Sequence, residues 1–110
     1  MRKPAKSSLK NKLWKLISEY VRRTAADEQG IVYCVTCFKR MPWKDSQAGH
    51  FLSGRTGSTL WDLRGIHPQC YRCNIHLKGN QAEYFRWMLD KYGLAVIDEL
   101  RFNKKQPEKY

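Results

Sequence analysis

Apolar residues recur at helical spacing near the start of the chain. Ser8 can cap a helix there and Gln29-Gly30 lies just beyond its end, so the spacing predicts a helix over 8–26. The lysines lie mostly on the opposite face, where contacts to phosphate and ordinary solvation are equally good explanations. The apolar face consists of Leu9, Leu13, Leu16, Ile17, Tyr20 and Val21.

Short apolar runs separated by turn residues predict strands in the middle of the chain. Pro68 suits the first turn of a helix over 69–77, which Gly79-Asn80 would end. The expected strands are 31–34, 47–52 and 60–66, and the segments 38–45 and 53–58 have the composition of loops.

A helical period returns in the last third of the chain. Residues 81–92 predict a helix that ends at Gly93, and residues 94–102 predict a last short helix. Aromatic residues on the first of these helices keep the helical period, which favours packing in a core over a stacking platform. The residues of this stripe are Tyr84, Trp87, Met88 and Tyr92.

A chain of 110 residues with no internal repeat and no long linker holds one domain at most. We expect a basic, disordered arm over 1–7 and a single domain of the α+β class over 8–110. That domain would comprise the N-terminal helix (8–26), a core over 31–80 and C-terminal helices over 81–102.

Charge points to a polyanionic partner. The chain has 21 Lys and Arg against 10 Asp and Glu, a formal net charge of +11. Residues 1–23 contain eight basic residues and one acid, Glu19, a local net charge of +7. Such a density favours nucleic acid over mere solubility, with an anionic membrane surface as a weaker alternative. The candidate DNA contacts are Lys10, Lys15, Arg22, Arg23, Arg55 and Lys78.

The start of the chain contains no apolar signal region, and no run approaches the roughly 20 apolar residues that span a bilayer. We therefore expect a cytoplasmic protein without a membrane partner. Thiols stay reduced in that compartment, which favours metal binding over disulfides.

All four cysteines fall in two Cys-x-x-Cys pairs. Thiolates at this spacing can surround one tetrahedral zinc ion, which would pin two distant segments together. A domain this small buries a modest core, so such a structural metal would add stability. The predicted zinc ligands are Cys34, Cys37, Cys70 and Cys73.

The zinc would also bring two polar residues close together. His50 lies between the pairs and Asn74 follows the second pair directly. A neutral imidazole can take a proton from water at physiological pH, so His50 is the candidate general base; a structural histidine is the alternative. The amide oxygen of Asn74 suits Mg²⁺ or Mn²⁺, and its alternative role is to stabilise the second knuckle.

These residues resemble the HNH nucleases, whose ββα-metal layout places a histidine strand before a second strand and a helix. More narrowly, the chain resembles the NinG/Rap recombination endonucleases of lambdoid phages over about residues 31–102. The resemblance implies a small zinc-stapled ββα-metal (HNH, His-Me finger) core with an N-terminal helix and C-terminal helices. It also places Asn74 where the family binds its catalytic metal. The matching residues are Gln69, Cys70, Cys73, Asn74, Gly79, Asn80, Tyr84, Tyr92 and Gly93.

Two positions depart from the HNH pattern. Gly49 stands where many of these enzymes have a metal-binding acid, and Gly65 stands where the central asparagine would fall. His67, three residues before Cys70, is the best substitute as a catalytic residue and metal ligand. Phosphate oxygens and waters usually complete a Mg²⁺ shell, so a sparse set of protein ligands does not exclude catalysis.

The resemblance implies a DNA endonuclease for branched recombination intermediates such as Holliday junctions and D-loops. Zinc would be structural and Mg²⁺ or Mn²⁺ catalytic. Two symmetric cuts imply a homodimer, and the partners could include a recombinase. The protein would act in the cytoplasm of a phage-infected bacterium. The alternatives are a non-catalytic, zinc-containing nucleic-acid-binding module and an HNH nicking or restriction-type nuclease.

Overall fold

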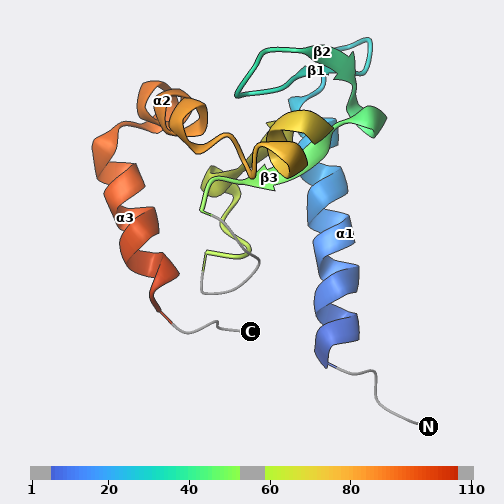
Figure 1. The fold of residues 1–110 in the computed structure, drawn as a ribbon. Coiled ribbons are helices and arrows are strands. Elements are labelled where there is room, and N and C mark those ends of the chain that lie inside the picture. Colours follow the sequence, from blue (N-terminus) through green and yellow to red (C-terminus); the bar gives the residue numbers. More distant parts are fainter. Residues whose placement is uncertain (1–5, 53–58, 107–110) are drawn as a thin grey trace, which may run out of the picture.

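The computed structural model describes residues 6–52 and 59–106 and shows a mixed α+β arrangement around two small antiparallel sheets (Figure 1). One sheet pairs β1 with β2, and the other pairs β3 with β4. Single helical turns, η1 and η2, lead into β3 and β4. In chain order the elements are α1 (Lys6–Ala25), β1 (Ile31–Tyr33), β2 (Arg40–Pro42), η1 (Trp43–Asp45), β3 (Gln47–His50), η2 (Leu63–Gly65), β4 (Ile66–Gln69), the short π-helix η3 (Arg72–His76), α2 (Gln81–Tyr92) and α3 (Leu94–Lys104).

The β3–β4 ribbon lies at the centre of the molecule and has two distinct faces. His50 pairs with Ile66, and Gly49 pairs with His67. Directly opposed residues share a face and successive residues alternate between faces. His50 and Ile66 therefore lie on one face of the ribbon, while Gly49 and His67 lie on the other.

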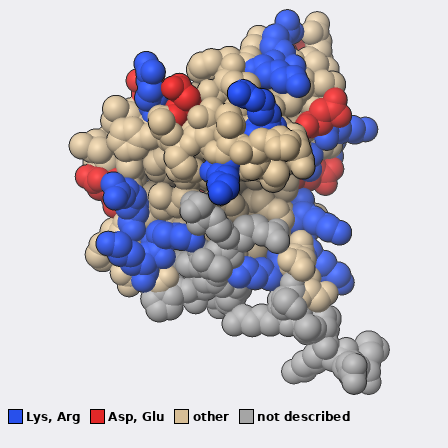
Figure 2. Space-filling model, viewed as in Figure 1, with Lys and Arg blue, Asp and Glu red and all other residues tan. Residues whose placement is uncertain are grey.

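Helix α1 packs along the His50 face of the ribbon. Val21 is buried there with Ala48 and Ile66, and Trp14 and Ile17 pack against them. Burial of this inward side supplies most of the stability of such a helix. The outward side carries basic residues, and Figure 2 shows Lys and Arg along the α1 side of the molecule and over α3.

The predicted apolar face of the first helix is divided in the structure. Ile17 and Val21 turn inward, whereas the remaining four apolar residues of that face are exposed. Those exposed residues are Leu9, Leu13, Leu16 and Tyr20.

Helices α2 and α3 build the main core on the other face. The hydroxyl of Tyr84 donates a 2.7 Å hydrogen bond to the carbonyl of Gly49, which ties α2 to β3. Gly93 separates the two helices with φ of 89°, a conformation that favours glycine. The predicted aromatic stripe is confirmed as core packing. The buried residues of this core are Val35, Phe51, Tyr84, Met88, Ile97 and Leu100, with Trp87 and Tyr92 packed against them.

The sequence predictions around Pro68 were wrong. The strand expected over 60–66 begins only at Ile66, and Pro68 lies inside it opposite Ala48 rather than in a helix. An edge strand tolerates proline because its missing N–H is not needed for pairing. The carbonyl of Pro68 instead accepts a 3.0 Å hydrogen bond from the backbone N–H of Val35, which ties β4 to the first cysteine turn.

The helix boundaries also shift. Helix α1 begins at Lys6, so residues 6 and 7 of the predicted arm belong to the helix. Ser8 lies within the helix rather than at its cap. Residues 1–5 lie outside the described part of the chain. A search of the described helices finds none that is long and apolar enough to cross a membrane.

Candidate functional site

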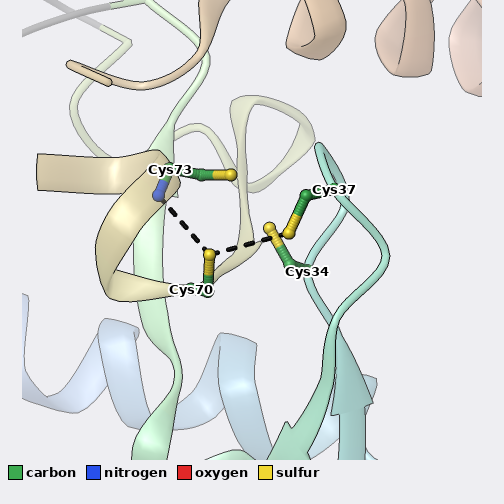
Figure 3. A group of neighbouring side chains, drawn as sticks. All are labelled: Cys34, Cys37, Cys70 and Cys73. Carbon is green, nitrogen blue, oxygen red and sulfur yellow. Dashed lines mark hydrogen bonds between the residues drawn. The ribbon is translucent and has the colours of Figure 1, made fainter. Parts of the chain in front are cut away.

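The four cysteines form a candidate metal centre (Figure 3). Their sulfur atoms all lie within 4.8 Å of one another, and the Sγ atoms of Cys37 and Cys70 are 3.7 Å apart. Zn–S bonds of about 2.3 Å in a tetrahedron place sulfurs roughly 3.8 Å apart. All four are free thiols rather than disulfides. This cluster could hold a metal ion such as zinc.

Local backbone structure sets up both halves of the cluster. After β1, the N–H of Phe38 donates a 2.7 Å hydrogen bond to the carbonyl of Cys34, and Phe38 takes a positive φ of 67°. At the start of η3, the N–H of Cys73 donates to Sγ of Cys70 at 3.4 Å. The Phe38 bond closes the first cysteine turn, and the N–H of Cys73 stabilises thiolate charge on Cys70 and orients its sulfur.

The surroundings of the sulfurs favour the thiolate at Cys34 and oppose it at Cys37. Burial raises the pKa of Cys34, yet hydrogen bonds from Thr36 and the backbone outweigh burial and lower the pKa to about 6. Burial raises the pKa of Cys37 to about 12. The side chain of Asn80 donates to Sγ of Cys73 at 3.6 Å. A dication is the natural neutraliser of four crowded thiolates, so these residues fit zinc.

Next to this centre, the structure brings His50 and Asn74 to the same cleft. The cleft has a volume of about 650 Å³ and lies between α1, β3 and the end of η3. Arg22 and Lys78 also line it. The two residues that the sequence predicted to lie close together, His50 and Asn74, therefore line one cleft in the structure.

The imidazole of His50 is held from two sides. Its ring stacks on the indole of Trp14, with ring centroids 4.7 Å apart and planes 22° apart. Its Nε2 lies 3.1 Å from the carbonyl oxygen of Leu60. A carbonyl can only accept, so Nε2 carries the proton and a neutral ring has its basic nitrogen at Nδ1.

Asn74 is oriented by a strand residue. Its Nδ2 donates a 2.7 Å hydrogen bond to Oε1 of Gln47, which also lines the cleft. This contact engages the amide nitrogen and leaves Oδ1 as the acceptor atom of the side chain. The oxygen is the atom that a hard cation prefers.

The chain is similar in sequence to a family of phage proteins. A sequence profile described as "Bacteriophage Lambda NinG protein" matches residues 2–110. The chain belongs to the NinG family. The protein called ninG of Salmonella phage P22 is 32% identical over 76 residues, which are 66% of this chain and 36% of that protein. For ninG of Escherichia phage lambda, the identity is 30% over 73 residues, 64% of this chain and 34% of that protein.

A third NinG relative, from Enterobacteria phage H19B, is 35% identical over 57 residues, or 51% of this chain and 28% of that protein. The NinG-family chain described here spans about a third of the length of the curated relatives it matches. No solved structure matches it.

In this NinG-family chain, Gly49 is explained by close packing. A Cβ atom at position 49 would overlap Oε1 of Gln69 and lie 2.8 Å from its Cδ. The Gln69 side chain is fully buried, and its Nε2 donates to Oγ1 of Thr36 at 3.1 Å and to the carbonyl of Gly79 at 2.9 Å. Gln69 thus links the two cysteine segments and occupies the space that an acid at position 49 would need.

Gly65 has a different environment. Among the residues that the structure describes, a Cβ atom there would meet only Cδ1 of Leu100, at an ordinary 3.8 Å. The nearby carboxylate of Asp62 is engaged by Arg64, whose Nη2 lies 2.8 Å away, and this hydrogen bond lowers the pKa of Asp62. Arg64 also pairs with Glu99 of α3 at 2.7 Å. Asp62 is therefore a structural ion-pair residue in this fold.

The structure does not bring His67 to the cleft. It lies on the other face of the ribbon, with its ring centroid 4.4 Å from that of Trp87 and its Nε2 donating to the carbonyl of Arg64 at 2.7 Å. The hydroxyl of Tyr92 lies 3.2 Å from the same nitrogen. Burial lowers the pKa of His67 to about 4. The alternation of side chains along β4 separates His67 from His50.

The predicted DNA contacts divide between the cleft and the outer side of α1. Arg22 and Lys78 line the cleft, and Lys15 lines a neighbouring hollow of about 470 Å³ beside Trp43. Arg23 stacks over Trp43 with 5.2 Å between its Cζ and the ring centroid. Lys10 lines a third hollow, beside Trp61, and Arg55 lies outside the described residues.

Sequence reasoning missed the contributions of Trp14, Gln47 and Gln69. Trp14 keeps the helical spacing of Ile17 and Val21, three and seven residues later, and that spacing could have assigned it to the inward side of α1. No comparable sequence signal marks Gln47 as the partner of Asn74.

Proposed function

We propose that this chain is a metal-dependent DNA endonuclease of the HNH type that acts on branched recombination intermediates. The observation that carries the proposal is the shared cleft of His50 and Asn74, beside a four-cysteine centre. The order of β3, β4 and η3 agrees with the strand, strand and helix of the HNH layout. Family membership agrees with the resemblance on which the substrate class rests.

His50 supplies the base in this proposal. Hydrolysis of a phosphodiester needs a water molecule to lose a proton as its oxygen attacks phosphorus. With Nε2 donating to the Leu60 carbonyl, Nδ1 is the atom that accepts this proton. Stacking on Trp14 holds the ring in place, which reduces the freedom that must be lost in the transition state.

Cationic side chains would hold the DNA backbone. Arg22 is fixed by a 3.1 Å hydrogen bond from its Nε to the carbonyl of Ser18, and its Nη1 donates to the carbonyl of Ser46 at 3.3 Å. Lys78 is exposed at the other side of the cleft. Both can contact phosphate oxygens next to the scissile bond.

Asn74 would hold the catalytic Mg²⁺ or Mn²⁺ through its amide oxygen. The described residues that line the cleft include amide and hydroxyl groups but no carboxylate. The donor set therefore fits a hard cation only with phosphate oxygens and waters as further ligands. When bound, such an ion supplies charge neutralisation at the phosphate.

Zinc on the four cysteines would be structural. It would join the turn after β1 to the start of η3, and so fix Asn74 relative to β3. The thiolates make up a complete tetrahedral set, which leaves no open position for substrate.

Branched DNA is the proposed substrate because the described surface offers phosphate contacts rather than base readout. Of the described basic groups that we identify, four lie on α1 and Lys78 follows η3, and they border three separate hollows rather than one row of base-reading side chains. Shape recognition agrees with this distribution. A homodimer that makes two cuts, and recruitment by a recombinase, belong to the same proposal.

The test is cleavage of a labelled four-way junction beside a linear duplex of the same sequence, with Mg²⁺ and Mn²⁺ supplied separately. We expect junction-selective cleavage that falls by at least about 100-fold in His50→Ala. His76→Ala is the matched control, because His76 is exposed and contacts Tyr71 away from the cleft. Wild-type cleavage by His50→Ala would reject His50 as the base. Preference for one linear sequence would favour a restriction-type nuclease.

The lack of a carboxylate among the described lining residues favours a second candidate. In this alternative the chain is a zinc-containing module that binds nucleic acid without cutting it. Tight, salt-dependent junction binding with no cleavage under either ion would select this function.

A further inference from the structure

Helix α1 has an exposed apolar stripe. The relative solvent exposures of Leu9, Leu13, Leu16 and Tyr20 are 52%, 41%, 65% and 56%. None of these side chains belongs to the core cluster that covers the inward side of the helix. Scattered exposed leucines are ordinary, but four on one line of one helix form a surface that an apolar partner would cover.

The spacing of the stripe matches a helix–helix seam. Its residues are separated by four, three and four positions. This alternation is the heptad spacing that lets one helix pack along another. The inward residues Trp14, Ile17 and Val21 lie roughly a quarter turn away at about 100° per residue, so α1 can pack on its own domain and on a partner together.

We propose that the partner is α1 of a second copy of this chain, packed antiparallel. A two-fold axis midway between Trp14 and Lys15 places Leu13 opposite Leu16 of the second copy. The same axis places Leu9 opposite Tyr20. Every member of the stripe therefore meets another member, as an isologous interface requires.

The flanking charges agree with the antiparallel direction. Lys12 and Glu19 lie on the same flank of the stripe and outside the core, and the Glu19 carboxylate also pairs with Arg23 of its own helix at 3.3 Å. In the antiparallel pair this flank meets its own copy, so Lys12 faces Glu19 of the second copy across the seam. Two-fold symmetry produces this opposite-charge pair twice.

The seam leaves both clefts accessible. Ser18 and Arg22 line the cleft and lie roughly half a turn from the stripe at about 100° per residue. The paired helices would therefore separate two outward-facing clefts. Two cuts in one branched DNA would use this arrangement, and only that consequence rests on the proposed endonuclease function.

Sedimentation equilibrium of the zinc-loaded protein without DNA tests the dimer. A seam of one helix per copy is smaller than the roughly 1,600 Å² of a standard interface. We therefore expect the average mass to rise with concentration from 13.0 kDa toward twice that value. Leu16→Glu should stay at 13.0 kDa throughout. Phe102→Glu on α3 is the control, because Phe102 is also 65% exposed and should leave the dimer intact.

A charge exchange tests the direction of packing. Lys12→Glu should weaken dimerisation about 3- to 10-fold, because it creates two like-charge contacts. Adding Glu19→Lys should restore the wild-type dissociation constant within about twofold. Circular dichroism confirms that each variant is folded.

Three results would overturn the proposal: a wild-type mass of 13.0 kDa at every concentration, equal dissociation by Phe102→Glu, or no recovery in the double exchange. None of these measurements involves cleavage. Failure of the dimer and failure of the nuclease proposal are therefore distinguishable.

Discussion

The two faces of the β3–β4 ribbon each carry a histidine, and they surround it in opposite ways. His50 lines an open cleft with Arg22 and Asn74. His67 lies among the rings of Trp87, Tyr92 and Tyr84 on the other face. The alternation of side chains along the paired strands therefore separates a histidine that lines an open cleft from one that is packed in the domain.

The difference shows that a histidine close in sequence to a cysteine pair need not line the cleft beside that pair. His67 is three residues from Cys70 and yet contacts aromatic rings, whereas His50 is twenty residues away and shares the cleft of Asn74. The strand register decides which histidine faces the cleft, because Ile66 rather than His67 pairs with His50 and shares its face.

The largest expected effect is unfolding of the whole domain, including both faces of the ribbon, when the metal centre is disrupted. Cys70→Ser, or chelation of the metal, should abolish the cooperative thermal transition, since binding of a structural zinc contributes on the order of 10 kcal/mol. Circular dichroism melts with parallel zinc analysis measure this. Tyr71→Ser is the matched control because Tyr71 is exposed between the two ligands. An unchanged melt in excess chelator would contradict a structural metal.

His67 should make stability depend on pH. Its pKa falls from an ordinary 6.5 to about 4 in the folded chain, chiefly through burial. The unfolded chain therefore binds a proton first as pH falls below about 6.5, and about 2–3 kcal/mol of stability is lost by pH 4. Urea denaturation of wild type and His67→Phe across this range measures the loss.

In that comparison, the difference between the two proteins should shrink or reverse as the pH falls, because phenylalanine does not titrate. Proton competition at the cysteines affects both proteins equally. Parallel pH profiles would show that burial of His67 does not govern stability in this range.

The two glycines of the ribbon region should respond differently to the same change. Gly49→Ala places a Cβ atom against the buried Gln69 side chain and should cost roughly 1–3 kcal/mol. Gly65→Ala places its Cβ atom at an ordinary 3.8 Å from Leu100 and should change stability much less. Urea midpoints of both variants test this, and equal midpoints would refute the packing explanation for Gly49.

The smallest expected effect is on DNA binding, and it compares one lysine on each side of the ribbon. Lys78→Ala should weaken junction binding and lower the slope of log affinity against log salt by about 1, because Lys78 lines the cleft. Lys91→Ala removes an equally exposed charge from the His67 side and should leave the slope unchanged. Equal losses from the two lysines would show that DNA does not favour the cleft.

Helical periodicity and cysteine spacing carried most of the correct predictions. The period of Tyr84 and Met88 predicted α2 and its buried side, and the Cys-x-x-Cys pairs predicted the sulfur cluster. Both signals are local and repeat several times, so single unusual residues do not obscure them.

The errors arose where long-range contacts override local preference. Pro68 suggested a helix start, but its carbonyl bonds to Val35 and its neighbours pair with β3. The register of β4 places His67 away from the cleft, and this register cannot be read from the sequence. The outward turn of Leu13 was equally hidden, since periodicity defines an apolar face without saying what covers it.

The contact between Gly49 and Gln69 has a consequence for how this chain can change. A carboxylate at position 49 requires a smaller residue at position 69, and that residue would also lose the bonds to Thr36 and Gly79. Either replacement alone is harmful, so the two positions can be exchanged only as a coupled pair. Substitution by the acid that many HNH enzymes have before their histidine would therefore meet a steric barrier at position 49 that a substitution at Gly65 does not meet.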